Sequence, residues 1–471
     1  MRKSELEVAR GIVSRIQRNG YEAFFVGGCV RDRLMGRACA EYDIASSAPP
    51  ERIARIFPRV VPVGKRFGVM LVIEDGHAVH VATFRADLGY RDGRKPSGVR
   101  FSSAREDVRR RDFTINALLY DPISDRLLDY VGGEADIRAG TVRAIGDPAV
   151  RFDEDRLRLL RAVRFASTLG FSIESATLAA IKGRAPGIRS VSGERVRDEL
   201  VKIMIGPGAG RGLELLGGTG LLEVILPEVH AMKGVRQHER LHPEGDVFAH
   251  TVRMLDRLER PDAVLAFAVL LHDVGKPPTF SVRDRIRFDG HAAEGARIAR
   301  EICGRLRFPS REREMIADCV GNHMAFLDVK RMREATLKRL MRRPTYSREL
   351  ELHRLDCLAS DRDLSAWEHL VRKEKEFGAE RISPRPLITG RDLIRMGWRE
   401  GPGIGRALAA LEELQLENRI STREEALVWA GKMRPPAGAD GEAEPRARAR
   451  RPGARGDGGR APRAPSAGPG P

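Results

Sequence analysis

The stretch EAFFVGGCVRDRLMG (residues 22–36) decides the fold of the first part of the chain. Its apolar residues end at Gly27-Gly28, which predicts a buried strand over Glu22–Val26, and the residues after the glycines predict a short helix over 29–36. Two glycines between a strand and a helix let backbone N–H groups approach a phosphate, and the helix N-terminus adds positive charge. Alone the signal is weak, because many strand–helix turns contain glycine.

Outward from this stretch, helix and strand signals alternate up to residue 145. Residues 1–20 predict a helix whose apolar face holds Leu6, Ala9, Ile12, Val13 and Ile16. Strands are predicted at 43–45, 60–63, 69–73 and 78–84, with Asp75-Gly76 as a hairpin signal. From residue 150 to 430 the pattern is helical. We therefore expect an α+β fold, with a mixed sheet and helices followed by all-helical domains and a disordered tail over 435–471.

The composition excludes several classes of protein. A chain of 471 residues predicts about three domains. It has no apolar run long enough for a membrane span, and its charged N-terminus does not read as a secretory signal. Five scattered cysteines without a CxxC pair favour a reducing compartment, and we expect a cytoplasmic protein.

The chain is strongly basic, with a net charge of +17. The tail holds seven arginines and four acids, so the body keeps +14. A body this basic favours a polyanionic partner, most often nucleic acid, although an arginine-rich proteome is an alternative explanation.

Glu41 and Asp43 follow the glycine pair. Acids at i and i+2 on a strand point to the same face and can hold Mg²⁺, usually with a third acid. For an acid pair alone, a solvated turn would be the better interpretation.

Further motifs form a set whose order and spacing resemble one family. They read RRDFTINA (110–117), DxxGGxxD (129–136), EDxxRxxRAxRF (154–165) and SGERVRDE (192–199). With the glycine and acid pairs they resemble the class II tRNA nucleotidyltransferase (CCA-adding enzyme) and bacterial poly(A) polymerase family. The resemblance implies a nucleotidyltransferase head over 1–150 and a helical base-recognition and RNA-binding domain over 151–235.

The resemblance also implies roles for individual residues. Asp43 and Glu41 would be catalytic and would hold Mg²⁺, while Asp112 and Asn116 would support the sugar and the local fold. The implied nucleotide-binding set is Gly27, Gly28, Arg31, Arg111, Asp112, Asn116, Asp155, Arg158, Arg161 and Arg164.

Asp155, Arg158, Arg161 and Arg164 recur every three residues, so we expect one drifting stripe on a helix. Cytosine and adenine both present an amine beside an unprotonated ring nitrogen. Asp155 would accept from the amine and Arg158 would donate to the nitrogen, whereas uracil and guanine would leave mismatched groups that cost about 1–3 kcal/mol each. Arg161 and Arg164 would then face phosphates or hold Asp155. The alternative is a solvated face of i,i+3 ion pairs.

The sequence departs from the family pattern in two places. Glu41 stands where the first acid is usually Asp. His80 stands where the family usually has a third carboxylate, and neutral imidazole is a poor Mg²⁺ ligand. Residues 87–103 fill the place of the family's flexible loop, which disfavours an enzyme that adds only the two C residues.

A second set of residues resembles the HD metal-dependent phosphohydrolase superfamily. The resemblance implies a helical HD domain over 236–370, with a further helical region over 371–434, and a hairpin over 276–291. The implied metal ligands, for a transition metal such as Ni²⁺ or Mn²⁺, are His250, His272, Asp273, His291, His323 and Asp356.

Taken together, the sequence predicts a tRNA nucleotidyltransferase that adds or repairs the 3′-terminal CCA with CTP and ATP. We expect no membrane partner, and a monomer or homodimer. One alternative is a poly(A) polymerase or an enzyme that adds only the last A. Another is a metal-dependent HD phosphohydrolase whose head is degenerate because of His80.

Overall fold

The structure is a computed structural model that describes residues 3–39, 41–64, 68–91, 95–237 and 245–433. The predicted disordered tail at 435–471 lies outside the described residues. The chain divides into two compact units, Met1–Ser383 and Pro384–Pro471. Across the described ranges, no helix has both the length and the apolar character that a bilayer span needs.

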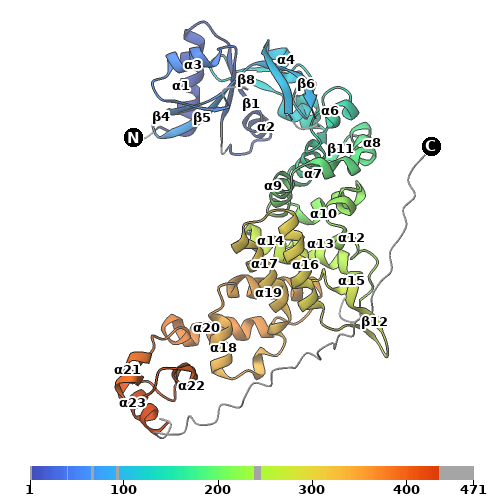
Figure 1. The fold of residues 1–471 in the computed structure, drawn as a ribbon. Helices are drawn as coiled ribbons and strands as arrows, with labels where there is room; N and C mark the ends of the chain where they lie inside the picture. The colour runs from blue at the N-terminus through green and yellow to red at the C-terminus, as the bar shows by residue number, and fades with distance from the viewer. Residues whose placement is uncertain (1–2, 40, 65–67, 92–94, 238–244, 434–471) are drawn as a thin grey trace, which may run out of the picture. The chain divides into compact units, whose positions relative to one another are not determined.

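The first unit begins with a mixed seven-stranded sheet in the order β3-β4-β5-β2-β1-β8-β9 (Figure 1). Strand β2 runs parallel to β5, and the other paired strands are antiparallel. The strands are β1 (Ala23–Val26), β2 (Asp43–Ser46), β3 (Val60–Gly64), β4 (Val69–Glu74), β5 (His77–Thr83), β8 (Leu119–Asp121) and β9 (Arg126–Leu128). The predicted mixed sheet is confirmed.

The two helices predicted in the head, over 1–20 and 29–36, are present, and four further helical segments accompany them among the described residues. They are α1 (Glu5–Arg18), α2 (Gly28–Leu34), α3 (Pro50–Ile56), α4 (Ala104–Arg109), η2 (Thr114–Asn116) and α5 (Gly133–Arg138). A capping box between Ser4 and Glu7 starts α1. Its buried face holds Val8 and the predicted residues from Ala9 to Ile16, but Leu6 is 43% exposed.

Residues 85–101 form an antiparallel pair, β6 (Arg85–Arg91) and β7 (Lys95–Phe101), around residues that lie outside the described ranges. The Gly, Pro and charged residues of 87–103 had predicted a loop. The pairing of the two backbones therefore overrides the local composition here.

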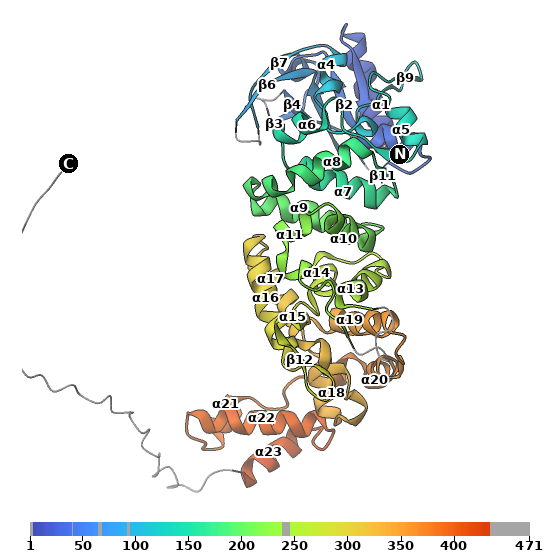
Figure 2. The ribbon, with the colours of Figure 1, turned by 90° about the vertical axis from the view of Figure 1, so that its right-hand side faces the viewer.

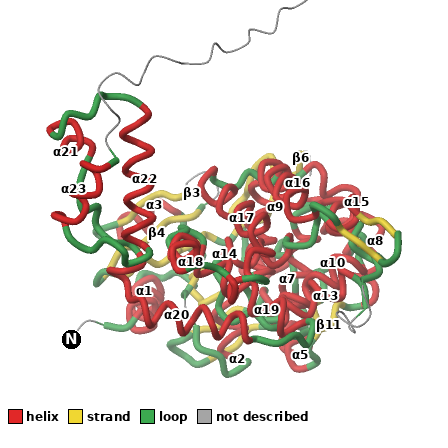
Figure 3. The backbone as a smooth tube through the Cα atoms, turned by 90° about the horizontal axis from the view of Figure 1, so that it is seen from below, coloured by secondary structure: helices red, strands yellow, loops and turns green. Residues whose placement is uncertain are grey.

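Helices dominate after residue 145, as Figure 3 shows in red. The region after the head contains α6 (Pro148–Glu154), α7 (Arg158–Leu169), α8 (Ser175–Arg184), η3 (Ala185–Ser190), α9 (Gly193–Met204), α10 (Ala209–Gly218), α11 (Leu221–Ile225) and α12 (Pro227–His230). The short strands β10 (Thr141–Val142) and β11 (Ser172–Ile173) pair in parallel and join it to the head.

The rest of the first unit is a helical layer in which α16 and α17 lie side by side (Figure 2). Its helices are α13 (Val247–Asp256), α14 (Ala263–Leu271), α15 (Lys276–Thr279), α16 (His291–Arg305), α17 (Ser310–Asn322), η4 (His323–Phe326), η5 (Val329–Arg331), α18 (Glu334–Met341), α19 (Tyr346–Ala359) and α20 (Ser365–Ile382). The predicted hairpin is present as β12 (Phe280–Val282) and β13 (Ile286–Phe288).

The second unit contains α21 (Gly390–Arg395), α22 (Pro402–Leu416) and α23 (Arg423–Lys432) around its own small core, which includes Leu393, Trp398 and Leu411. The boundary predicted at residue 370 falls inside α20, and the second compact unit begins at Pro384.

Candidate active sites

The turn at Gly27-Gly28 starts helix α2, which positions Arg31. Gly27 caps α2 with φ 81°, a backbone conformation that favours glycine. One turn into the helix, Arg31 is buried and donates from Nη1 to Oδ1 of Asn116 at 2.7 Å. Its Nε donates to Asp32 at 2.9 Å. Two members of the predicted nucleotide-binding set, Arg31 and Asn116, are therefore brought together, although they are 85 positions apart.

Asp43 opens β2 directly opposite Val26, beside the glycine turn. Its carboxylate is 57% exposed and lies 3.7 Å from Nδ1 of His80, which the parallel β2–β5 register places next to it. Loss of solvent around this carboxyl raises the pKa of Asp43, while the charges of His80 and Arg111 act in the opposite direction. The position of the usual third carboxylate is thus occupied by an imidazole in contact range of Asp43.

Glu41 does not lie on the strand, because β2 begins only at Asp43. The prediction that both acids alternate along one strand was wrong in this respect. Glu41 is exposed, and its charge still acts on the pKa of Asp43.

Arg111 is held by a buried acid that the sequence analysis did not single out. Asp107 accepts from Nη2 of Arg111 at 3.0 Å and from Arg110 at 2.6 Å. Burial would raise the pKa of Asp107, but these two guanidinium groups hold it below its usual value. Asp107 thereby fixes Arg111 on the side of the head that carries Asp43.

A buried network joins the head to α7. Asp112 accepts from Nε of Arg161 at 2.7 Å and from the backbone N–H of Phe113 at 2.9 Å. Burial opposes the charge of Asp112, yet Arg161 and the Phe113 N–H keep its pKa below the usual value. The ring of Phe165 lies between Arg31, Arg161 and Arg164, at 5.4, 5.4 and 4.4 Å from their guanidinium carbons.

The predicted stripe of four residues on one helix was wrong for Asp155. Helix α6 ends at Glu154, Asp155 has φ −148° and ψ 103°, and α7 begins at Arg158. Asp155 lies in the break because its side chain accepts from the Leu157 N–H at 3.1 Å, which competes with the helical pattern.

Of the two alternatives predicted for Arg161 and Arg164, facing phosphates or holding Asp155, the second is wrong. Asp155 is bound by Arg195 at 2.8 Å, and neither Arg161 nor Arg164 holds it. Arg158 contacts Glu154 at 2.5 Å, and Arg164 contacts Glu199 at 3.3 Å. Glu199 is the last residue of the SGERVRDE motif. Buried arginines need hydrogen-bond acceptors, and this requirement could have indicated from the sequence that further acids, such as Glu154 and Glu199, belong to this site.

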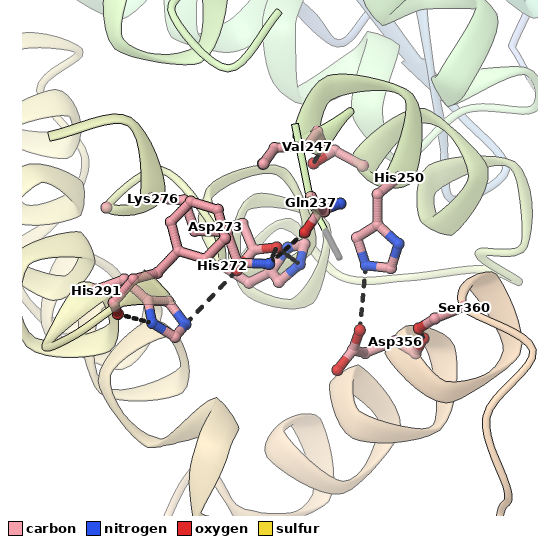
Figure 4. Close-up of polar contacts among 12 residues, drawn as sticks. Gln237, Val247, His250, His272, Asp273, Lys276, His291, Asp356 and Ser360 are labelled. Atoms are coloured by element: carbon pink, nitrogen blue, oxygen red, sulfur yellow. Dashed lines mark hydrogen bonds and ion pairs between the residues drawn. The ribbon is translucent and has the colours of Figure 1, made fainter. Parts of the chain in front are cut away.

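The six predicted HD residues converge in the helical layer. Figure 4 labels five of them: His250, His272, Asp273, His291 and Asp356. Two groups of three place one ligand atom each within 4.8 Å of the others: His250 with His272 and Asp273, and Asp273 with His291 and His323. Asp356 completes the set through its contact with Nε2 of His250 at 3.1 Å.

Backbone carbonyls fix the tautomer of three of these histidines. Nδ1 of His272, His291 and His323 lies 2.8, 2.8 and 2.6 Å from the oxygens of Val269, Phe288 and Val320. Since a carbonyl only accepts, each Nδ1 carries the proton and each Nε2 presents a lone pair to the centre. Burial lowers the pKa of His323 to about 4 and also lowers that of His291, so both rings are neutral.

These lone pairs lack donors. The buried Nε2 of His272 makes no hydrogen bond within the described part of the chain and lies 3.1 Å from a carboxylate oxygen of Asp273, and the Nε2 atoms of His291 and His323 face each other at 3.2 Å. Asp273 is ionised, because the Lys276 ammonium lies 2.6 Å from its carboxylate and its pKa is held well below the usual range despite burial. Neutral imidazoles and a carboxylate with unmet lone pairs fit a divalent metal ion.

Three family descriptions match successive parts of the chain. "Poly A polymerase head domain" matches residues 23–143, "Probable RNA and SrmB- binding site of polymerase A" matches 170–233, and "HD domain" matches 246–363. Together with the two sites, they define a nucleotidyltransferase head joined to an HD domain.

Among known proteins, the CCA-adding enzyme of Levilactobacillus brevis is 33% identical over 90% of this chain and 97% of its own length. The chain belongs to the CCA-adding enzyme family. The CCA-adding enzymes of Bacillus licheniformis and Geobacillus stearothermophilus are 46% and 44% identical, over 52% and 46% of this chain. Those two matches span only 63% and 54% of the relatives' lengths.

Solved structures agree with this assignment. The crystal structure of the Bacillus stearothermophilus CCA-adding enzyme in complex with CTP has a TM-score of 0.71 and 27% identity, over 91% of this chain and 98% of that one. The Thermotoga maritima enzyme complexed with tRNA shares the fold, with a TM-score of 0.57 at 20% identity, over 91% of this chain and 96% of that one.

We expect Asp112→Asn to lower the free energy of unfolding by about 3–5 kcal/mol at pH 7, because Arg161 loses its buried counter-charge. A carboxyl with a lowered folded pKa stabilises the fold above its unfolded pKa of about 4, and this stabilisation is lost as the pH falls through the folded pKa. The difference between wild type and variant should therefore shrink below about pH 4.

Denaturant unfolding followed by circular dichroism at several pH values measures this difference. Asp153→Asn is the matched control, because its ion pair with Arg184 is exposed and should contribute less than about 1 kcal/mol. A loss for Asp112→Asn that is the same at pH 3 and pH 7 would show that shape, and not charge, is responsible.

Proposed function

We propose that the chain is a template-independent tRNA nucleotidyltransferase that adds or repairs the 3′-terminal CCA with CTP and ATP. The observation that carries this proposal is the set around Asp43: an accessible carboxylate beside the glycine turn, with Arg31 and Arg111 anchored by buried partners nearby. The full-length similarity to a CCA-adding enzyme supports the choice of tRNA as primer.

In this reaction the tRNA 3′-hydroxyl oxygen forms a bond to the α-phosphorus of the nucleotide, and the bond from that phosphorus to the β-phosphate bridging oxygen breaks. Pyrophosphate leaves and takes the displaced electron pair. Gly27, Gly28 and Arg31 would bind the triphosphate, with Arg111 beside it, while Asp112 and Asn116 hold these groups in place. Asp43 and Glu41 are oxygen donors that fit Mg²⁺, which when bound neutralises charge on the phosphates and activates the hydroxyl.

Base selection would rest on Asp155 and Arg158. Asp155 lies at the helix break, where its carboxylate can accept from an exocyclic amine, and Arg158 would donate to the ring nitrogen. Arg195 and Glu154 hold the two side chains in position. Arg161 and Arg164 are engaged by Asp112 and Glu199, so we assign them to support of this surface.

The domain limits of 1–150, 151–235, 236–370, 371–434 and 435–471 stay our proposal. All five cysteines are free thiols, which supports a cytoplasmic site of action. The alternative nucleotidyltransferase function is the addition of A alone or of a poly(A) tail. Incubation of tRNA that ends at the discriminator base with each labelled nucleotide separates them: only a CCA-adding enzyme incorporates C before A.

A second activity is favoured by the unmet lone pairs of the HD site. A cavity of about 370 Å³ opens onto this site, and Lys276, Arg285, Arg287 and Arg362 line it. Guanidinium and ammonium groups beside a metal site favour a phosphoester substrate. We infer a phosphatase or phosphodiesterase that acts on 2′-phosphates or 2′,3′-cyclic phosphates, with water attacking phosphorus and an ester oxygen leaving. Ni²⁺, Mn²⁺ or a similar ion, held by the six ligands, would supply the activated water.

We expect Asp43→Asn to reduce nucleotide addition by about a thousandfold or more, because the interaction that it removes acts on the transition state. tRNA binding should change little, since it rests on many distributed phosphate contacts. Primer extension and filter binding measure the two quantities. Asp75→Asn, an exposed turn acid on the same sheet, should leave both unchanged. Continued addition by Asp43→Asn would remove the metal assignment.

His80→Glu should lower the Mg²⁺ concentration for half-maximal addition by roughly fivefold, because one more charge near Asp43 is equivalent to about 1 kcal/mol. Titration of the rate with Mg²⁺ measures the change. His77→Glu adds the same charge at the other end of β5 and serves as the control. If His80→Glu is slower at every Mg²⁺ concentration, His80 is an adapted part of the site.

Arg158→Ala should reduce discrimination of CTP and ATP against UTP and GTP by about tenfold or more, and affect affinity for the triphosphate less. Ratios of kcat/KM for the four nucleotides measure this. Arg156→Ala removes a neighbouring arginine that contacts only Ser190 among the described side chains, and should leave the ratios intact. An equal loss for all four nucleotides would indicate a phosphate role for Arg158.

Asp273→Asn should remove bound transition metal and the Ni²⁺- or Mn²⁺-stimulated cleavage of 2′,3′-cyclic phosphates, while CCA addition survives. Elemental analysis of protein purified without chelators and a cleavage assay measure these effects. Asp289→Asn, which alters the same cavity without touching the ligands, is the control. If wild-type protein neither binds metal nor cleaves such esters, the HD site is structural. If it cleaves but adds no nucleotide, the chain is a hydrolase with a degenerate head.

A further inference from the structure

A second cavity in the head lies apart from the nucleotidyltransferase site. It has a volume of about 590 Å³ and is bounded by α1, by α2 with the residues after it, and by the turn between β8 and β9. Arg31, Asp43 and Arg111 do not line it. These elements lie close together in the blue part of Figure 1.

Three aromatic rings form one wall of this cavity. Phe25 on β1 faces Tyr120 on β8 through the strand register, with ring centroids 6.4 Å apart. Tyr42 packs on the other side of Phe25, at 5.2 Å. The ring of Phe25 is only 3% exposed and supports the other two, so the partly exposed rings of Tyr42 and Tyr120 are the surfaces that a planar base can contact.

Three arginines surround the same cavity. Arg33 lies 4.5 Å above the ring of Tyr120 and 3.5 Å from Asp125. Arg10 and Arg37 are exposed, and within the described residues no carboxylate lies in ion-pairing range of either. Three guanidinium groups against the single carboxylate of Asp125 leave the cavity electropositive, which favours an anionic ligand.

We propose that this cavity is a second binding site for a nucleoside polyphosphate, distinct from the catalytic site. The base would pack against Tyr42 and Tyr120, and the phosphates would lie among Arg10, Arg33 and Arg37. Asp125 supplies an acceptor for a ribose hydroxyl or an exocyclic amine. The volume suits a small ligand, since cavities for such ligands span roughly 300–1,000 Å³.

Tyr42 connects the cavity to the catalytic strand. It precedes Asp43, and its backbone N–H donates to Glu5 on α1 at 3.3 Å. A ligand that packs against the Tyr42 ring restrains the residue next to the catalytic carboxylate. The site is therefore placed to adjust nucleotide addition to nucleotide supply.

Cys39 offers a local readout, because it lines the cavity and is partly exposed, whereas the other four cysteines are buried. The experiment measures the rate of Cys39 alkylation by peptide mass spectrometry in the full chain, with ATP or with inorganic tripolyphosphate. We expect ATP to slow alkylation of the wild type. Tripolyphosphate should need a concentration about tenfold higher, because it lacks the stacked base.

Two variants test the site independently of any enzymatic activity. Arg37→Glu removes a phosphate contact, and Ala38→Trp fills the entrance. Both should raise the half-protecting ATP concentration about tenfold or more. Arg52→Glu on α3 has the same charge change outside the cavity and should behave as wild type.

Protection that persists unchanged in both variants comes from the catalytic site and would overturn the proposal. Absence of protection in the wild type at millimolar ATP overturns it as well. Equal protection by tripolyphosphate overturns the assignment of a nucleoside. Circular dichroism confirms that each variant is folded. Since alkylation needs neither tRNA nor addition, failure here is distinguishable from failure of the proposed nucleotidyltransferase function.

Discussion

The buried ion pair between Asp112 and Arg161 is the interaction on which the nucleotidyltransferase site depends. It joins the segment just before η2 in the head to α7, at 2.5–2.7 Å, across 49 residues of chain. Asn116, which Asp112 supports, in turn holds Arg31 beside the glycine turn. Removal of either charge would leave the other buried and unpaired, which costs several kcal/mol. The Gly27-Gly28 turn and helix α7 are thus linked through the carboxylate of Asp112.

Phe165 explains how three like charges can gather there. Arg31, Arg161 and Arg164 repel one another, but each contacts the face or edge of one ring and each has its own polar partner. Burial still lowers the pKa of Arg164 despite the opposing charge of Glu199. The cluster is satisfied from behind by Asn116, Asp112 and Glu199, so its outer side is free to meet anionic ligand groups.

The sequence predicted the mixed sheet and the helical regions, and its predictions were wrong where partners distant in the sequence determine the local structure. The strand that ends at Val26 and the Gly27-Gly28 turn could be predicted, because an apolar run and a glycine pair determine the backbone conformation of their own short segment. Asp155 was misplaced because three-residue spacing cannot reveal a helix break, which depends on a side-chain bond to Leu157 and on Arg195, 40 residues away. Glu41 was wrongly predicted to lie on the strand, because β2 starts at Asp43, the residue that pairs with Val26 at the end of β1. The convergence of the six HD residues was predicted only from the resemblance to a known superfamily, because their spacing in the sequence has no helical or strand period that would bring them together.

The two sites acquire their charge in opposite ways. The HD site places buried acids among neutral imidazoles, so a cation is needed to complete it. In the head, Asp43 stands partly exposed with Arg111 and His80 as its neighbours, and the acid that such sites usually add is absent. A site with one carboxylate fewer attracts a divalent cation less and a triphosphate more. Since the nucleotide carries its own bound Mg²⁺ to the protein, stronger attraction for the polyphosphate offsets weaker attraction for the metal. Under the proposed function, His80 would shift the balance of this site toward the nucleotide, and its presence does not by itself imply that the head is degenerate.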